Sequence, residues 1–220
     1  TADGGSTLGG RPVWWDPDVQ RINYNKQGQF LGEFQSEDRV LIVLDNYEYY
    51  ITTFDENNHY ESNVMIVEKY NPQKVWTLIM WDIENKCYNL KRALLDAKAT
   101  KQNLLGDTDR FQMATAVEGN KLSIDARRQG QPLFSTVAYP RFRVTLGKPD
   151  DFRPALEIEA EEFIQVRSIG TKGKRLTPYK VAFIEELEPL RQPEPEPEIS
   201  SETEDGAGEA EGPSDPESLF

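Results

Sequence analysis

Along most of the first 190 residues, apolar and polar positions alternate with a period of two, and this spacing predicts β-strands. Short strands are expected over residues 13–24 (two strands around a turn), 30–34, 39–44, 48–54, 64–70, 75–82, 87–93, 111–117, 121–125, 133–138, 142–146, 155–160, 163–169 and 180–184. The helical spacing is clearest over residues 94–105, where Gly106 would end a helix.

Two pairs of these strands carry the clearest signals. Residues 39–44 and 48–54 flank the turn formers Asp45 and Asn46, which predicts a hairpin. Residues 75–82 are almost continuously apolar, so we expect a strand buried on both faces, with residues 87–93 running back.

Many short strands with closely spaced turns predict an all-β fold, as a sandwich, barrel or propeller. Residues 39–46 are similar to the inner hairpin of one repeat unit, and residues 163–167 with the following Gly-Lys loop are similar to the edge of another. Repeats of roughly 40 to 50 residues with four strands each indicate propeller (β-pinwheel) blades. The 184 residues before the acidic end hold three or four such blades, so we expect an incomplete set. We expect a linker-like lead-in over residues 1–12, one domain over 13–190 and a tail over 191–220.

The net charge of −13 is unevenly distributed. Residues 185–220 hold thirteen acidic residues and one basic residue, a charge of −12, whereas residues 1–184 hold 25 acidic and 24 basic residues. Low hydrophobicity and high charge predict that the tail is disordered. The domain itself is neutral but rich in charge, so a local basic patch remains possible.

Several classes of function find no support in the sequence. Cys87 and His59 are the only residues of their types, which argues against an internal disulfide, a zinc site and nucleophilic catalysis. The glycine-rich residues 4–11 lack the Lys-Ser/Thr ending of a phosphate-binding loop. No apolar run is long enough to span a membrane. We expect no catalytic residues, no metal site and no cofactor, and a cytoplasmic location.

Basic residues gather in a few places. Residues 167–180 hold five cations, with glycines that permit close approach of the backbone to a phosphate. Arg141 and Arg143 flank Phe142 in an expected strand and therefore point to the same face. The candidate DNA-binding residues are Arg127, Arg128, Arg141, Arg143, Arg167, Lys172, Lys174, Arg175 and Lys180. Other basic groups are Lys91-Arg92 and Lys98 with Lys101. The sequence shows neither a base-reading helix motif nor the stacked-aromatic motif of single-strand binders, so we expect contacts mainly to phosphates.

Several motifs resemble one protein family. They are TLGGRPVWWD (residues 7–16), LGEF (31–34), FDENNHY (54–60), NPQKVW (71–76), GKRLT (173–177) and EELEP (185–189). Together they resemble the C-terminal region of the A subunit of bacterial DNA topoisomerase IV or DNA gyrase, of the Bacteroidetes type. The resemblance covers roughly residues 5–190.

This resemblance implies a β-pinwheel that binds and bends duplex DNA and presents it to the catalytic core of a type II topoisomerase for strand passage. It also implies that the catalytic core of the same subunit and the separate ATPase subunit are partners, and that the catalytic parts lie outside this chain. Residues 126–131 and 170–175 only partly match the glycine-rich basic box of gyrase, so a topoisomerase IV-like role is expected. An acidic tail would restrain DNA wrapping.

The alternative left open by the sequence is a protein-interaction module that docks partner subunits. In that case the tail would contact a basic partner.

Overall fold

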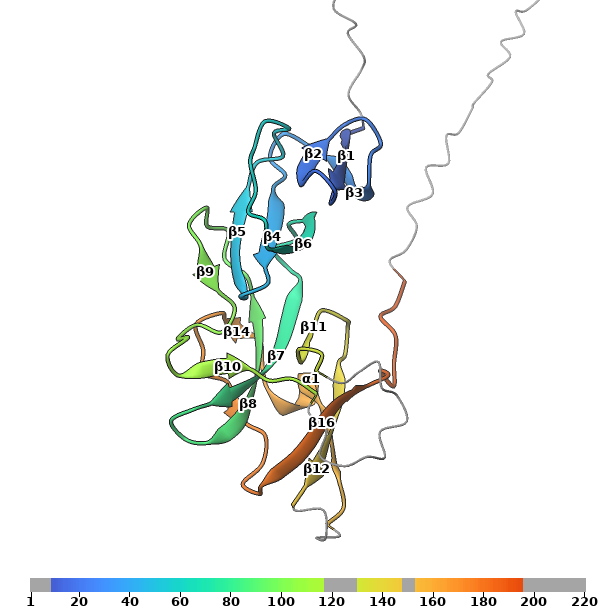
Figure 1. The fold of residues 1–220 in the computed structure, drawn as a ribbon. Coiled ribbons are helices and arrows are strands. Elements are labelled where there is room, and N and C mark those ends of the chain that lie inside the picture. The colour runs from blue at the N-terminus through green and yellow to red at the C-terminus, as the bar shows by residue number, and fades with distance from the viewer. Residues whose placement is uncertain (1–8, 117–129, 148–152, 196–220) are drawn as a thin grey trace, which may run out of the picture.

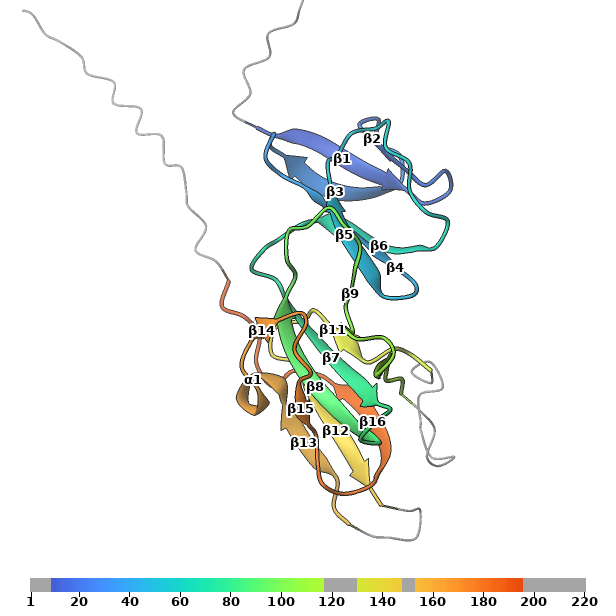
Figure 2. The same cartoon turned by 90° about the vertical axis from the view of Figure 1, so that its left-hand side faces the viewer.

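The structure is a computed structural model that describes residues 9–116, 130–147 and 153–195. Within these ranges the chain is built from β-strands and contains one helical turn, α1 (Ala160–Phe163). The prediction of an all-β fold is therefore confirmed. The strands form four sheets that follow one another along the molecule (Figures 1 and 2). The described residues form no closed propeller.

The first two sheets form the upper part of Figure 1. The first sheet, in the order β2-β1-β3, consists of β1 (Arg11–Asp16), β2 (Arg21–Asn23) and β3 (Gln29–Phe34). The second sheet, in the order β6-β4-β5-β9, consists of β4 (Val40–Leu44), β5 (Glu48–Thr52), β6 (Val64–Lys69) and β9 (Gln102–Asn103).

The other two sheets form the lower part. The third sheet has β7 (Val75–Asp82) and β8 (Cys87–Leu94) at its centre, flanked by β10 (Phe111–Met113), β11 (Phe134–Ser135), β14 (Arg167–Ser168) and β15 (Lys174–Arg175). The fourth sheet, in the order β13-β12-β16, consists of β12 (Arg141–Leu146), β13 (Leu156–Glu159) and β16 (Val181–Leu187).

Apolar cores fill the spaces between successive sheets. In β4 the side chains of Val40, Ile42 and Leu44 pack with the first sheet, whereas Leu41 and Val43 pack with the third. All five are buried, because alternate side chains of a strand point to opposite faces. The second sheet is therefore an inner layer with a core on each side.

The third sheet is also an inner layer. Trp76, Leu78 and Met80 of β7 face the second sheet, and Ile79 joins the core shared with the fourth sheet. The prediction that residues 75–82 are buried on both faces is confirmed, and so are both predicted hairpins, β4–β5 and β7–β8.

The helix predicted over residues 94–105 is wrong. β8 continues to Leu94, and β9 pairs with β5 in the second sheet. Leu95, Leu104 and Leu105 are buried in the core between the second and third sheets. These contacts, together with the pairing of β9, outweigh the local helical preference.

The strand predicted over residues 163–169 is largely wrong. α1 includes Phe163, and only Arg167 and Ser168 form a strand. The expected strand at residues 121–125 lies outside the described residues. No helix in the described part of the chain is long and apolar enough to cross a membrane.

Candidate nucleic-acid interface

A basic segment, residues 167–180, runs along the edge of β8 that faces away from β7. β14 pairs in parallel with the end of β8, and β15 pairs antiparallel with Asn89 and Leu90. The chain therefore reverses direction between two short strands on one edge (Figure 2). The segment contains Arg167, Lys172, Lys174, Arg175 and Lys180, and no acidic residue occurs between Glu162 and Glu185.

Side chains of β8 hold the backbone of this region in place. The Lys91 ammonium donates a 2.6 Å hydrogen bond to the carbonyl of Ile169, and the Asn89 amide donates one of 3.1 Å to the carbonyl of Lys172. On the other face, Arg92 donates a 3.1 Å hydrogen bond to the carbonyl of Ile164. Polar side chains of one strand thus satisfy carbonyls that no sheet ladder pairs.

A glycine permits the close approach of the segment to β8. Gly173 has φ +73°, and a Cβ at this position would lie 2.5 Å from the carbonyl oxygen of Leu90. This backbone conformation and this spacing both require glycine. Gly173 therefore fixes the position of Lys172 and Lys174 on either side of it.

The five cations of the basic segment are exposed. Within the described residues, none of them forms an ion pair with a carboxylate. Lys174 Nζ lies 4.4 Å from the centroid of the Phe163 ring, a cation–π contact that orients the side chain without neutralising its charge. The segment thus presents uncompensated positive charge to solvent.

Arg141 and Arg143 are in a different situation. They lie on the outer face of β12, as predicted, but Glu157 and Glu185 surround them. Arg141 Nη1 is 3.0 Å from Glu157 Oε2, and Arg143 Nη1 is 3.0 Å from Glu185 Oε1. Their charge is already compensated, so the structure does not join them to the basic segment as one unpaired patch.

Other basic groups differ further from the expectation. Arg127 and Arg128 lie outside the described residues. Lys91 is completely buried, so it is not a surface cation. Burial lowers the pKa of Lys91 to about 8 and also lowers the pKa of Arg92.

Sequence reasoning missed a group of residues beside the basic segment. Arg175 and Lys180 line a pocket of about 530 Å³. A third cation, Lys86, and three aromatic side chains, Trp81, Tyr88 and Tyr179, line it as well. The aromatic residues come from β7, β8 and the β15–β16 connection. Their contribution depends on strand pairing, which composition alone does not specify.

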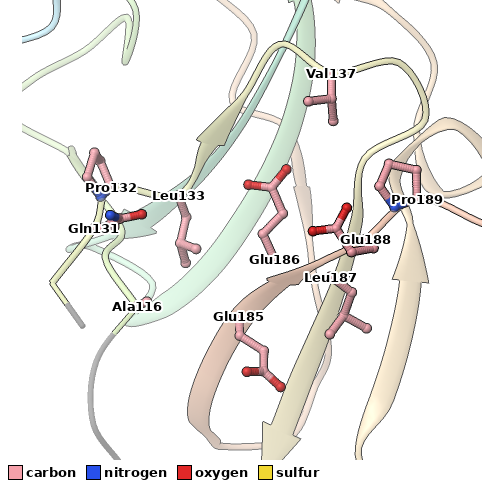
Figure 3. A pocket seen from close by; sticks show the side chains of 10 residues that line it. All are labelled: Ala116, Gln131, Pro132, Leu133, Val137, Glu185, Glu186, Leu187, Glu188 and Pro189. Atoms are coloured by element: carbon pink, nitrogen blue, oxygen red, sulfur yellow. The ribbon is translucent and has the colours of Figure 1, made fainter. Parts of the chain in front are cut away.

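A second pocket has the opposite character (Figure 3). It lies between β16 and residues 131–137 and holds about 280 Å³. Glu185, Glu186 and Glu188 line it together with apolar residues such as Leu133 and Leu187. Carboxylates in this position disfavour a phosphate.

The residues considered for catalysis are not arranged for it. His59 is exposed between β5 and β6, and Cys87 is buried in β8. Burial raises the pKa of the Cys87 thiol, which disfavours the reactive thiolate. No group of three or more His, Cys, Asp or Glu side chains in the described ranges is placed to hold a metal ion.

The comparisons with known proteins identify the family. A family model described as the topoisomerase C-terminal domain of Bacteroidota matches residues 21–188. The chain belongs to this family. In this topoisomerase C-terminal domain the match extends from β2 to β16 and includes the whole basic segment. Searches of curated proteins and of solved structures found no match to the chain.

Proposed function

We propose that this chain is the accessory domain of a type II topoisomerase A subunit that binds and bends duplex DNA. The family supports a topoisomerase role. The observation that carries the DNA-binding role is the row of exposed cations in the basic segment, which pair with no carboxylate of the described residues. Each phosphate that a cation neutralises releases counterions, which favours binding at low salt.

The proposed contacts go to phosphates rather than to base edges. The segment is a narrow edge of short strands and turns, with no helix that could enter the major groove. Lys172, Lys174 and Arg175 extend from a rigid backbone, while Arg141 and Arg143 would have to exchange Glu157 and Glu185 for phosphate. We therefore assign the main contacts to the basic segment and only a secondary role to these two arginines.

The wider role follows from this assignment. The four sheets would be blades of a pinwheel in the parent subunit, and DNA bent along its rim would be delivered to the catalytic core for strand passage. The domain itself would carry no catalytic residue and no cofactor. The catalytic core and the ATPase subunit would be its protein partners in the cytoplasm. The incomplete match to the gyrase box favours a topoisomerase IV-like activity.

The test is a titration of labelled duplex DNA, followed by fluorescence anisotropy at several salt concentrations. Replacing Lys174 and Arg175 together by Gln should weaken binding and lower the salt slope by about 2, one for each phosphate that is no longer neutralised. The matched control replaces Lys98 and Lys101 by Gln. These lysines are also exposed, but they pair with Asp96 and Glu61 at 3.9 and 2.7 Å.

The control should bind DNA like the unmodified protein, although it loses the same charge. Equal salt slopes for all three proteins would contradict the proposal, as would undetectable binding of duplex by the unmodified protein at low salt.

A protein-interaction module is the second candidate, and the pocket of Figure 3 favours it. Its apolar walls, which include Leu133 and Leu187, suit a partly apolar peptide, and the glutamates around them disfavour DNA. A partner bound there should still be captured by the Lys174→Gln/Arg175→Gln protein, and DNA should not compete with it. Such a result, combined with no binding of DNA, would favour this candidate over the first.

A further inference from the structure

The pocket that contains Arg175 and Lys180 differs in charge from two other pockets of the molecule. Here it is called the cationic pocket, defined by Lys86, Arg175 and Lys180 with Trp81, Tyr88 and Tyr179. Among the described residues, no aspartate or glutamate lines it. A pocket of similar size, about 520 Å³, contains Arg11 and Arg39 but also Asp55 and Glu56. The pocket of Figure 3 is lined by three glutamates.

The cationic pocket is built from two parts of the chain that are fixed to each other. One wall comes from the end of the β7–β8 hairpin, and the other from the connection between β15 and β16. The backbone of Leu176 donates a 2.9 Å hydrogen bond to the carbonyl of Tyr88, which joins the two walls. The turn after Leu176 is held by a 3.2 Å hydrogen bond from the Tyr179 amide to the Thr177 hydroxyl.

The aromatic residues of the pocket are of two kinds: Trp81 and Tyr88 pack against each other, whereas Tyr179 is exposed to solvent. The rings of Trp81 and Tyr88 lie opposite each other across β7 and β8, with centroids 4.7 Å apart and planes inclined by 60°. Tyr179 is 52% exposed, and the Arg153 guanidinium lies 4.7 Å from its ring centroid. A planar ligand could stack on Tyr179 by replacing the Arg153 guanidinium, while Trp81 and Tyr88 line the other wall of the pocket.

We propose that the cationic pocket binds an unpaired nucleotide, with the base against the aromatic rings and the phosphate near the cations. The proposal rests on the DNA-binding role and extends it, because Arg175 and Lys180 belong to both the pocket and the basic segment. The volume is of the size that holds a small planar ligand with its phosphate. Aromatic stacking with adjacent cations is how proteins hold single-stranded nucleic acid without reading its sequence.

The same charge would attract an acidic peptide, but the aromatic residues favour a nucleotide. A carboxylate needs only the cations, whereas three rings at one site offer π-faces that a nucleobase can match. The pocket also lies at the end of the row of cations, so a strand whose phosphates follow the segment would bring an unstacked base to it.

The test uses the full chain and five probes. They are a DNA duplex closed by linkers that carry no base, the same duplex with a short single-stranded thymidine extension, a thymidine oligonucleotide, inorganic phosphate and an acidic peptide with the charge of the oligonucleotide. Binding is followed by anisotropy and by the fluorescence of Trp81, which a stacked base should quench. The Trp81→Phe protein identifies that signal among the four tryptophans.

Tyr179→Ala should weaken binding of the oligonucleotide by about fivefold or more, which is the loss expected for one base–aromatic stack. Tyr179→Phe retains the aromatic ring and should bind the oligonucleotide as tightly as the unmodified protein does. Both proteins should bind the closed duplex like the unmodified protein. Lys86→Gln, which removes a cation on the opposite wall, should weaken binding of the oligonucleotide but not of the closed duplex.

The two proposals fail in different ways. No binding of the closed duplex contradicts the duplex-binding role, while the pocket is judged by the single-stranded probes. An oligonucleotide that binds no more tightly than the acidic peptide or inorganic phosphate overturns the nucleotide proposal. Equal affinity of Tyr179→Ala and Tyr179→Phe for the oligonucleotide overturns it as well.

Discussion

The ammonium group of Lys91 lies 2.6 Å from the carbonyl oxygen of Ile169, and both residues are buried in the third sheet and its edge. Among the described residues no carboxylate pairs with this lysine. Burial therefore lowers its pKa to about 8. The lysine anchors the backbone that carries the basic segment, although its own charge is destabilised there.

This arrangement predicts that Lys91 contributes a stability that increases with pH from about 8 to 10, opposed from about pH 9 by the buried Cys87 thiol, whose pKa burial raises. In this range the unfolded chain still holds the proton on Lys91, whose ordinary pKa is 10.5, while the folded chain has lost it. A difference of one pKa unit between the folded and unfolded chain changes the free energy of unfolding by about 1.4 kcal/mol. Above pH 10 the trend should reverse, because burial raises the pKa of Tyr49 and Tyr60 to about 12 and the unfolded chain ionises these tyrosines first. Urea unfolding at successive pH values measures both trends.

Lys91→Met is the control for the rising limb, which is the increase of the free energy of unfolding between pH 8 and 10. The protein should lose the increase between pH 8 and 10 and keep the decrease above pH 10. If Lys91→Met shows the same rising limb, another group is responsible for it.

Gly173→Ala should destabilise the fold by about 1 kcal/mol or more and weaken DNA binding. The substitution forces alanine into a left-handed conformation and places its Cβ against the Leu90 carbonyl. β15 would have to move away from β8. Gly170→Ala is the matched control, since no atom lies within 4 Å of its added Cβ. Urea unfolding and anisotropy of both variants check the prediction, and equal effects at the two glycines would contradict it.

Asp82→Asn should cost about 3 kcal/mol, because it breaks a buried ion pair. Asp82 is fully buried, 3.0 Å from Arg110, and its carboxylate also accepts hydrogen bonds from the backbone amides of Glu84 and Asn85 in the β7–β8 turn. The hydrogen bond from Arg110 holds the pKa of Asp82 at about 2. The stabilisation is therefore complete above the ordinary pKa of 3.8 and is lost as the pH falls towards 2.

Glu84→Gln provides the comparison for Asp82. Glu84 pairs with the same arginine at 3.3 Å, but its side chain is 69% exposed. The substitution should change the free energy of unfolding, measured by thermal unfolding, by about 0.5 kcal/mol or less. A loss as large as that of Asp82→Asn would show that exposure does not decide the contribution of this pair.

Removal of residues 196–220 should strengthen binding of duplex DNA, by about tenfold at low ionic strength. This stretch contains nine acidic residues and no basic residue, so we expect it to compete with phosphate for the basic segment. Ending the chain at Pro195 retains the contacts of Arg191 with Glu161 and with the Tyr139 ring. Anisotropy titrations of both forms measure the difference, which should vanish at about 1 M salt, where the Debye length is about 3 Å. Equal affinities at low salt would contradict a competing role.

The inner strands could be predicted well because burial on both faces requires a continuous run of apolar residues in the sequence. Residues 75–82 are apolar on both faces, and only a strand between two cores needs that composition. The β4–β5 hairpin was equally clear, since its turn residues lie between two apolar runs.

The errors occurred where distant contacts decide the local structure. Leu95 and Leu104 join a core between two sheets, and no local pattern shows that residues 102–103 pair with β5. Nor does the sequence distinguish Lys174, which pairs with no carboxylate in the described part of the chain, from Arg143, which lies between Glu157 and Glu185. Partners from other strands, rather than the residue itself, determine which cation is available.

The pairing of β14 and β15 with β8 also affects how the domain is made. β8 ends at Leu94, whereas its partners on this edge follow only at residues 167–175. During synthesis the chain begins to fold from its N-terminus. The edge of β8 therefore remains unpaired until nearly the whole domain has been synthesised. An unpaired strand edge can form hydrogen bonds with other chains. The surface assigned to DNA is completed last, so a nascent or prematurely ended chain would be both unable to hold DNA and prone to aggregate.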